Sequence, residues 1–126
     1  MIADALNADI GRILAWLGGY RFDCANEYRL QAGVATVLAV HGCRFEREVV
    51  LSPTDRVDFL TESGLAIECK VDGSPADVTR QVLRYLRHDR VGGLLLVTAR
   101  AQLLRTVALR GAGKPAGTIA VSRSAL

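Results

Sequence analysis

Apolar and polar residues alternate on both sides of a short polar segment in the middle of the chain. Glu62-Ser63-Gly64 is that segment, and the runs beside it, 56–61 and 65–70, are rich in Val, Ile, Phe and Leu. Such runs are typical of β-strands. A glycine in third place suits the commonest three-residue hairpin loop, whose last residue takes a positive φ. The pattern therefore predicts a β-hairpin over residues 56–70.

The register of this hairpin brings charged side chains together. A turn centred on Ser63 places Asp58 directly opposite Glu68, and alternation puts Lys70 on the same face as Glu68. The other face is apolar, with Val57, Phe59, Ile67, Cys69 and Val71 as its predicted members. Like charges opposite each other are destabilising. The pair is therefore either an ordinary part of a solvated strand face or a pair that shares a cation such as Mg²⁺, which binds through one or two carboxylates.

Periodicity and capping residues predict the other elements of a single domain spanning 1–126. The predicted helices are 2–17, 24–41, 75–90 and 100–110, and the other predicted strands are 44–51, 92–97 and 118–122. Asp23 and Ser74 are the expected N-caps of the second and third helices. The first helix has an apolar stripe for packing or self-association, formed by Ile2, Leu6, Ile13 and Leu17. The run over 92–97 is apolar throughout, as in a strand buried on both faces.

Glu27 lies on the apolar face of the helix predicted over 24–41, one turn before Leu30 and two turns before Val34. Burying an ionised carboxylate without a partner is costly. Two interpretations follow. Glu27 lies in water at the first turn, where the helix dipole favours an acid, or it points at a cation shared with the hairpin.

The helix predicted over 75–90 has three different faces. One is an apolar core stripe, the opposite one is basic, and one margin carries an amide and a phenol. These faces hold, in turn, Val78, Val82 and Leu86; Arg80, Arg84 and Arg87; and Gln81 and Tyr85. The arginines either line a solvated face or bind phosphates.

Charge is distributed unevenly along the chain. Residues 1–72 carry a net charge of −4 and residues 73–126 a net charge of +7. A basic second half is the pattern expected of a protein with a polyanionic partner. Of the 16 basic residues only Lys70 and Lys114 are lysines. A lysine beside two carboxylates in so arginine-rich a chain indicates a need for a compact ammonium group.

Composition limits the class of protein. Hydrophobic residues make up 50% and charged residues 23%, as in a soluble globular domain. The three cysteines are scattered and form no CxxC pair, which favours reduced thiols in the cytoplasm. The N-terminus lacks the basic segment of a signal peptide, and no apolar run is long enough to span a membrane.

The chain resembles the PD-(D/E)XK nuclease superfamily over about residues 24–98. The resemblance rests on the order α-β-β-β-α-β, with Glu27 on the first helix, followed by Asp58 and then by Glu68-Cys69-Lys70. The segment from Gln81 to Tyr85 resembles the QxxxY motif of the RecB-like branch, and the overall size resembles the archaeal Holliday-junction resolvases. Val57 stands where the motif's name puts Pro, a change that removes no chemistry.

The resemblance implies a restriction-endonuclease-like α/β fold with an αβββαβ core and a mixed central sheet flanked by helices. The N-terminal helix (1–19) is then an addition to the catalytic core (24–98), and a helix and strand (99–126) follow it. The implied function is hydrolysis of DNA phosphodiester bonds with Mg²⁺, or Mn²⁺ as its substitute.

The same resemblance assigns roles to individual residues. Asp58, Glu68 and the Cys69 carbonyl would bind the metal, with Glu27 as a direct or water-mediated ligand, and Lys70 would orient the attacking water. Gln81 and Tyr85 would support the site. The expected contacts to DNA phosphates are Arg80, Arg84, Arg87, Arg100, Arg105 and Lys114. The alternatives are a dimeric Holliday-junction resolvase, with the first helix as its candidate dimer surface, or a non-catalytic DNA-binding module or accessory subunit.

Overall fold

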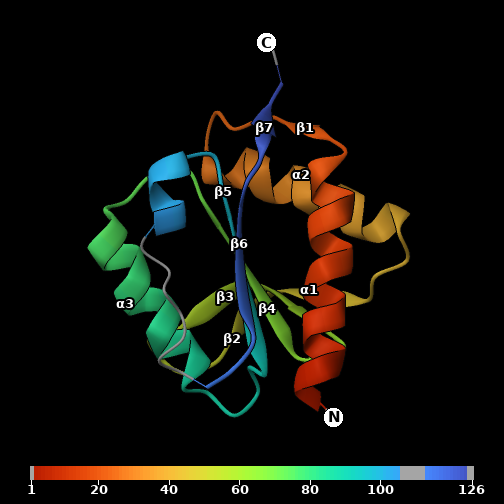
Figure 1. Cartoon of the computed structure of the whole chain (residues 1–126). Helices are drawn as coiled ribbons and strands as arrows, with labels where there is room; N and C mark the ends of the chain where they lie inside the picture. The colour runs from red at the N-terminus through yellow and green to blue at the C-terminus, as the bar shows by residue number, and fades with distance from the viewer. Residues whose placement is uncertain (1, 106–112, 125–126) are drawn as a thin grey trace.

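The chain folds into three layers, with a mixed β-sheet between two layers of helices (Figure 1). This computed structural model describes residues 2–105 and 113–124. Its helices are α1 (Ile2–Gly18), α2 (Glu27–Val40) and α3 (Pro75–Leu86), with a 3₁₀ helix η1 (Ala101–Arg105). Its strands are β1 (Arg21–Phe22), β2 (Phe45–Val50), β3 (Arg56–Thr61), β4 (Leu65–Lys70), β5 (Gly93–Thr98), β6 (Ala116–Ala120) and β7 (Ser122–Arg123).

The large sheet has the strand order β2-β3-β4-β5-β6. Strands β2, β3 and β4 form an antiparallel meander, α3 makes the crossover, and β5 and β6 then add parallel to β4. The predicted order of elements and the central place of the acidic hairpin are confirmed. Every residue of β5 is buried, as its continuous apolar run predicts.

Two apolar clusters hold the layers together, one on each face of the sheet. The first joins α1 and α2 to residues such as Phe59 and Ile67, and the second joins α3 and η1 to residues such as Ala66 and Leu94. Figure 1 shows α1 and α3 on opposite sides of the sheet. The buried stripe of α1 is Leu6, Ile10, Ile13 and Leu17. This stripe is used for packing within the domain, so it does not provide the self-association surface considered above.

The start of α2 differs from the prediction. The helix begins at Glu27 with Asn26 as its N-cap, whose side chain accepts a hydrogen bond from the Arg29 N–H at 2.8 Å. Asp23, the predicted cap, instead accepts from the Ala25 N–H and pairs with Arg29. The reason is a long-range contact: β1 pairs in parallel with β7 near the other end of the chain and holds the preceding segment extended.

The ends of the helices and strands in the second half of the chain also differ from the prediction. Helix α3 begins as expected, with the Ser74 side chain accepting from the Asp77 N–H, but it ends at Leu86 rather than at residue 90. The helix predicted over 100–110 is a single 3₁₀ segment as far as Arg105, and the rest of it lies outside the described residues. The predicted last strand is present as β6, which starts two residues earlier. None of the helices described is both long and apolar enough to cross a membrane.

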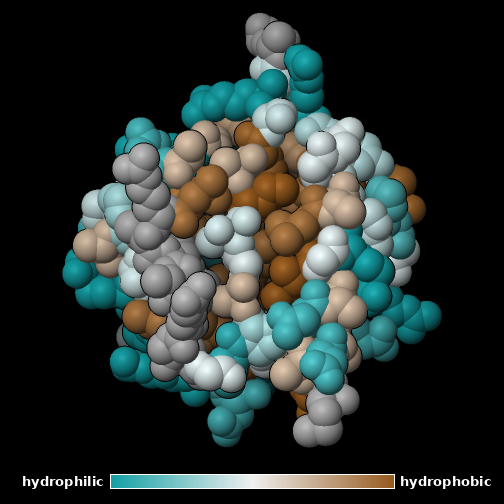
Figure 2. Space-filling view, viewed as in Figure 1, coloured by the Kyte–Doolittle hydropathy of each residue, from teal (hydrophilic) through white to brown (hydrophobic). Residues whose placement is uncertain are grey.

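Apolar side chains also reach the surface. Strand β6 is an edge of the large sheet, and all five of its residues are only half-buried. Figure 2 shows apolar side chains gathered beside β6, between η1 and α1, with hydrophilic side chains around them.

Candidate active site

The regular main-chain pairing between strands β3 and β4 ends at Asp58 and Glu68. The ladder between them includes Phe59 opposite Ile67 and Leu60 opposite Ala66, which confirms the predicted hairpin register. One step further, the Asp58 N–H donates to Oε1 of Glu68 at 3.1 Å, and the Cys69 N–H donates to Oδ2 of Asp58 at 2.8 Å. Each carboxylate therefore takes the place of a strand carbonyl. The two acids are inserted between the strands instead of standing on a solvated face.

The prediction that Val57 and Phe59 share one face of β3 is wrong. Phe59 packs in the cluster with α1 and α2, whereas Val57 packs in the cluster with α3. On β2, Arg47 lies over the Phe59 ring while Val49 joins Val57. At the same level Glu48 adopts a left-handed backbone conformation with φ 52°. Positions 47 and 49 of β2 and positions 57 and 59 of β3, which regular alternation would keep on one face, thus contact different clusters.

Glu68 is held in an almost closed environment. It is 4% exposed, accepts a long hydrogen bond of 3.4 Å from the Tyr85 hydroxyl, and has Nζ of Lys70 at 3.8 Å from the same oxygen. Burial, followed by the charge of Asp58, raises the pKa of Glu68 to about 8, against the opposing effect of Lys70. Burial also raises the pKa of Tyr85, so its hydroxyl remains a donor.

Asp58 is half-buried beside Glu68. Burial raises its pKa to about 6; the Cys69 N–H lowers it, and the charges of Glu48 and Glu27 raise it further. Because the two carboxyl groups interact directly, they titrate as a pair. One lysine at 3.8 Å does not neutralise both, so near neutral pH the pair keeps a proton unless another cation is present.

Glu27 occupies the first position of α2 and is half-buried. Its negative charge raises the pKa of both Asp58 and Cys69. Within residues 2–105 and 113–124, however, no three side chains of His, Cys, Asp or Glu lie close enough to hold a metal ion together. The carboxylate donors of the site are therefore Asp58 and Glu68, with Glu27 at longer range.

Cys69 contributes through its main chain. Its N–H points to β3, and because the N–H and C=O of one strand residue point the same way, its carbonyl also faces Asp58. Its thiol lies in the core beneath α1 and α2, where burial raises its pKa well above the usual value. The oxygen atoms around the splayed strands are hard donors of the kind that Mg²⁺ prefers.

Tyr85 is more deeply buried than predicted, and Glu48 is a neighbour of the site that the sequence did not indicate. Tyr85 was expected at the margin of α3 but is buried in its core face, and Gln81, one turn earlier, is half-buried. Glu48 is exposed and pairs with Arg56 at 3.1 Å, and it lies opposite Asp58. Only the pairing of β2 with β3 across the turn at 52–55 could have indicated this proximity.

The predicted phosphate contacts have different surroundings. Arg84 donates to buried Asp55 at 2.6 Å, and Lys114 donates to the carbonyls of His88 and Val91. Both cations are thus engaged within the protein, which weighs against the role expected of them. Arg80 pairs with Asp77 on the surface, Arg87 is exposed, and Arg100 donates to the Gly73 carbonyl beside the loop after β4. The side chain of Arg105 lies outside the described part.

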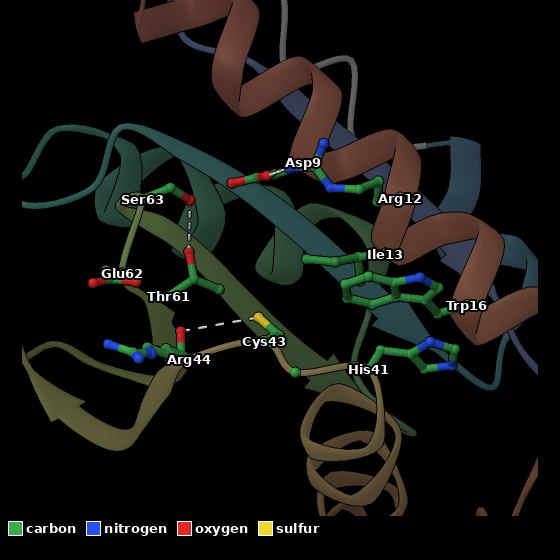
Figure 3. Close-up of a pocket in the computed structure, with 11 residues that line it drawn as sticks. Asp9, Arg12, Ile13, Trp16, His41, Cys43, Arg44, Thr61, Glu62 and Ser63 are labelled. Atoms are coloured by element: carbon green, nitrogen blue, oxygen red, sulfur yellow. Dashed lines mark hydrogen bonds and ion pairs between the residues drawn. The ribbon is translucent and has the colours of Figure 1, made fainter.

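A separate hollow of about 510 Å³ lies at the other end of the hairpin (Figure 3). Trp16 stacks on His41 with ring centroids 4.7 Å apart, and Thr61 and Ser63 share a hydrogen bond at 2.9 Å on the opposite wall. None of the predicted site residues lines it. The candidate site is therefore not this concavity but the gap between β3 and β4.

Comparison of the chain with protein-family models, curated proteins and solved structures finds no match.

Proposed function

We propose that the protein is a metal-dependent nuclease that hydrolyses DNA phosphodiester bonds through Asp58, Glu68 and Lys70, on a restriction-endonuclease-like version of the observed α/β fold. The observation that carries the proposal is the pair of carboxylates inserted between parting strands, with a lysine ammonium beside it. Buried acids with raised pKa values and too little internal countercharge are typical of functional sites.

A divalent cation supplies the missing countercharge. Oδ2 of Asp58 and Oε1 of Glu68 accept main-chain N–H groups. Oδ1 of Asp58, a remaining lone pair of Glu68 Oε2 beside the Tyr85 hydroxyl, and the nearby Cys69 carbonyl would bind a cation. When bound there, Mg²⁺ or Mn²⁺ supplies neutralisation of phosphate charge and a lower pKa for a water molecule. Glu27 adds negative charge from α2 and is placed to act through a water.

The remaining residues orient this pair. The Tyr85 hydroxyl and the Asp58 N–H hold the two oxygens of Glu68 in a fixed direction. Lys70 keeps its ammonium group near the carboxylates, where it is placed to hold the attacking water and to stabilise charge in the transition state. Gln81, on the same helix as Tyr85, is a further support on this flank.

A non-catalytic DNA-binding module is the second candidate. It is favoured by one observation: each acid already accepts a hydrogen bond from the opposite strand, so the pair can serve as a structural clasp without metal. A dimeric junction resolvase is a variant of the first proposal that differs in substrate and not in chemistry.

Cleavage assays test the proposal. Pure protein is incubated with supercoiled plasmid, linear duplex, single-stranded DNA and a four-way junction, with Mg²⁺, Mn²⁺ or EDTA. We expect cleavage with either metal and none with EDTA. Glu68→Gln, Asp58→Asn and Lys70→Ala should each lower the rate by about 100-fold or more.

Glu62→Gln is the matched control, because it removes one exposed carboxylate from the opposite end of the same hairpin. It should cleave like the unmodified protein. Absence of metal-dependent cleavage on all four substrates would favour the non-catalytic module, and full activity of Lys70→Ala would remove that residue from the mechanism.

A further inference from the structure

We propose that a basic groove along the outer flank of α2 binds the phosphate backbone of a single nucleic-acid strand. The groove consists of two adjoining hollows of about 650 and 370 Å³, which share Asp23 and Arg29. The first lies between the segment before α2 and the C-terminal strand β7. The second continues between residues 20–23 and α2 towards the C-terminal end of that helix. This inference rests on the proposed function, because it identifies the surface that would bind the strand to be cleaved.

The groove carries an excess of positive charge. Its charged side chains are Arg21, Arg29 and Arg123 against one acid, Asp23. Asp23 pairs with Arg29 at 2.8 Å, so that pair is neutral. The guanidinium groups of Arg21 and Arg123 are exposed and have no hydrogen bond or ion pair with any residue of the described ranges. Each hollow therefore holds one free guanidinium group, Arg123 in the first and Arg21 in the second, and the two charges together are suited to a polyanion.

Both arginines are held in place by the small parallel sheet. Arg21 pairs with Ser122 and Phe22 with Arg123, and the Ser124 N–H donates to the Phe22 carbonyl at 2.8 Å. Phe22 is buried while Arg21 points outward. These contacts join segments that are about 100 residues apart in the sequence, so the backbone positions from which the two arginines extend are set before any ligand binds.

Gly33 allows this segment to approach α2 closely. A Cβ at position 33 would lie 2.9 Å from Cδ1 of Phe22, which is closer than carbon atoms tolerate. Beyond Gly33 the groove is lined by small side chains, Ala32 and Thr36, and it ends at Tyr20, which is 40% exposed. An aromatic ring in a narrow basic groove is the combination that binds single strands, since every base can stack on it.

The groove leads towards the candidate active site. Asn26 lines the first hollow and the next residue is Glu27. The Val121 N–H, just before β7, donates to the carbonyl of Thr98, which pairs with Lys70. The first hollow therefore lies at the end of the sheet that carries Lys70, and the second continues from it along α2. In Figure 2 the side chains at the end of the molecule with β1 and β7 are strongly hydrophilic.

Binding is measured by fluorescence anisotropy in EDTA, with a labelled 20-nucleotide oligothymidine as probe, at several salt concentrations. Arg21→Ala/Arg123→Ala should weaken binding by about 25-fold at about 0.1 M salt and reduce the slope of log affinity against log salt by about 1.4, since each lost phosphate contact contributes about 0.7. Arg44→Ala/Arg90→Ala has the same net charge and alters exposed arginines at the opposite end of the sheet, so it should bind like the unmodified protein. Circular dichroism checks that both variants are folded.

Three results would overturn the proposal: equal losses in the two double variants, no loss in the groove variant, or a loss found only in Arg80→Ala/Arg87→Ala on α3. A 20-base-pair duplex should depend less on the groove than the single strand does, and an equal dependence would overturn the single-strand assignment. Cleavage is scored separately. Groove-dependent binding without metal-dependent cleavage leaves this site standing and removes the nuclease, whereas cleavage that is insensitive to the groove variant does the reverse.

Discussion

Asp55 and Glu68 are equally shielded from solvent, and their surroundings have opposite effects on them. Each is 4% exposed. Asp55 accepts from His88 at 2.8 Å and from Arg84 at 2.6 Å, and these contacts hold its pKa below the usual value although burial opposes them. Glu68 has a second carboxylate beside it and a lysine at 3.8 Å, and its pKa is raised.

The difference separates a carboxylate whose charge is balanced by its neighbours from one whose charge is not. Asp55 fastens the turn between β2 and β3 to the end of α3, and its charge is balanced within the protein. The charge of the Asp58–Glu68 pair is not balanced, so the pair favours a proton or an external cation. Burial alone does not distinguish the two; the count of opposite charges does.

The largest expected effect on stability comes from the balanced carboxylate. Asp55→Asn leaves Arg84 and His88 without their anion and should lower the free energy of unfolding by about 1–3 kcal/mol, a range reduced from that of a fully buried pair because Arg84 is half-exposed. Glu68→Gln removes a repelling charge, so we expect it to leave the metal-free protein as stable or more stable. Urea unfolding in EDTA measures the free energy of unfolding of both variants. If Glu68→Gln lost as much stability as Asp55→Asn, the contrast between the two carboxylates would be contradicted.

The two sites should also respond to pH in opposite directions. The pKa of Asp55 is lowered, so its contribution to stability is complete above the unfolded value of 3.8 and is lost as the pH falls through the folded value. The pKa values of Asp58 and Glu68 are raised to about 6 and about 8, so their contribution is complete below 3.8 and 4.5 and is lost as the pH rises through those folded values.

Unfolding in EDTA across this range tests the opposition. Between about pH 5 and pH 8 the unmodified protein should lose stability relative to Glu68→Gln, because the former must give up two protons from the pair and the variant only that of Asp58. Asp55→Asn should follow the unmodified protein over this interval and differ from it less in acid. A constant difference between the unmodified protein and Glu68→Gln would show that the pair is not strained.

Tyr85→Phe should have a smaller effect. It removes one long hydrogen bond to Glu68 and leaves the ring in the core, so we expect a stability change of about 0.5–1 kcal/mol. Glu68 then loses a fixed direction, and the midpoint of a Mg²⁺ titration should shift to higher concentration. An unchanged midpoint would limit Tyr85 to packing.

Glu27→Gln should have the smallest effect on stability, since the side chain is half-exposed at the first turn of α2. Relief of its repulsion with Asp58 should leave the metal-free protein as stable or slightly more stable. If Glu27 acts on the cation through water, its removal also weakens the response to Mg²⁺. An unaltered response would leave it as an acid favoured only by the helix dipole.

The sequence predicts those features that local periodicity determines. The register of Asp58 and Glu68 and the buried strand β5 follow from spacing alone, and the structure confirms them. The predicted stripe of α1 is confirmed at Leu6, Ile13 and Leu17 but is wrong at Ile2, which lies exposed at the start of the helix. The cap of α2 was misplaced because the pairing of β1 with β7 links distant segments that local patterns do not connect.

Side-chain partners were harder to predict. Arg84 looks like one of three equivalent surface arginines, yet it is tied to Asp55, a residue 29 positions earlier. Phe59 and Val57 pack on different clusters although they are two residues apart, at the level where Glu48 of the neighbouring strand has a left-handed backbone that no propensity favours. In each case the decisive contact joins elements that only the folded sheet brings together.

The most direct test of the account is whether the Asp58–Glu68 pair binds a divalent cation. Thermal unfolding at about pH 8 is followed with increasing Mg²⁺ or Mn²⁺, for the unmodified protein, Glu68→Gln and the control Glu62→Gln. A ligand that binds only the folded state at 10 to 100 times its dissociation constant stabilises it by about 1.4–2.7 kcal/mol. The account predicts this rise for the unmodified protein and for Glu62→Gln, and its loss in Glu68→Gln. An equal rise in all three proteins, or no rise in any, would contradict it.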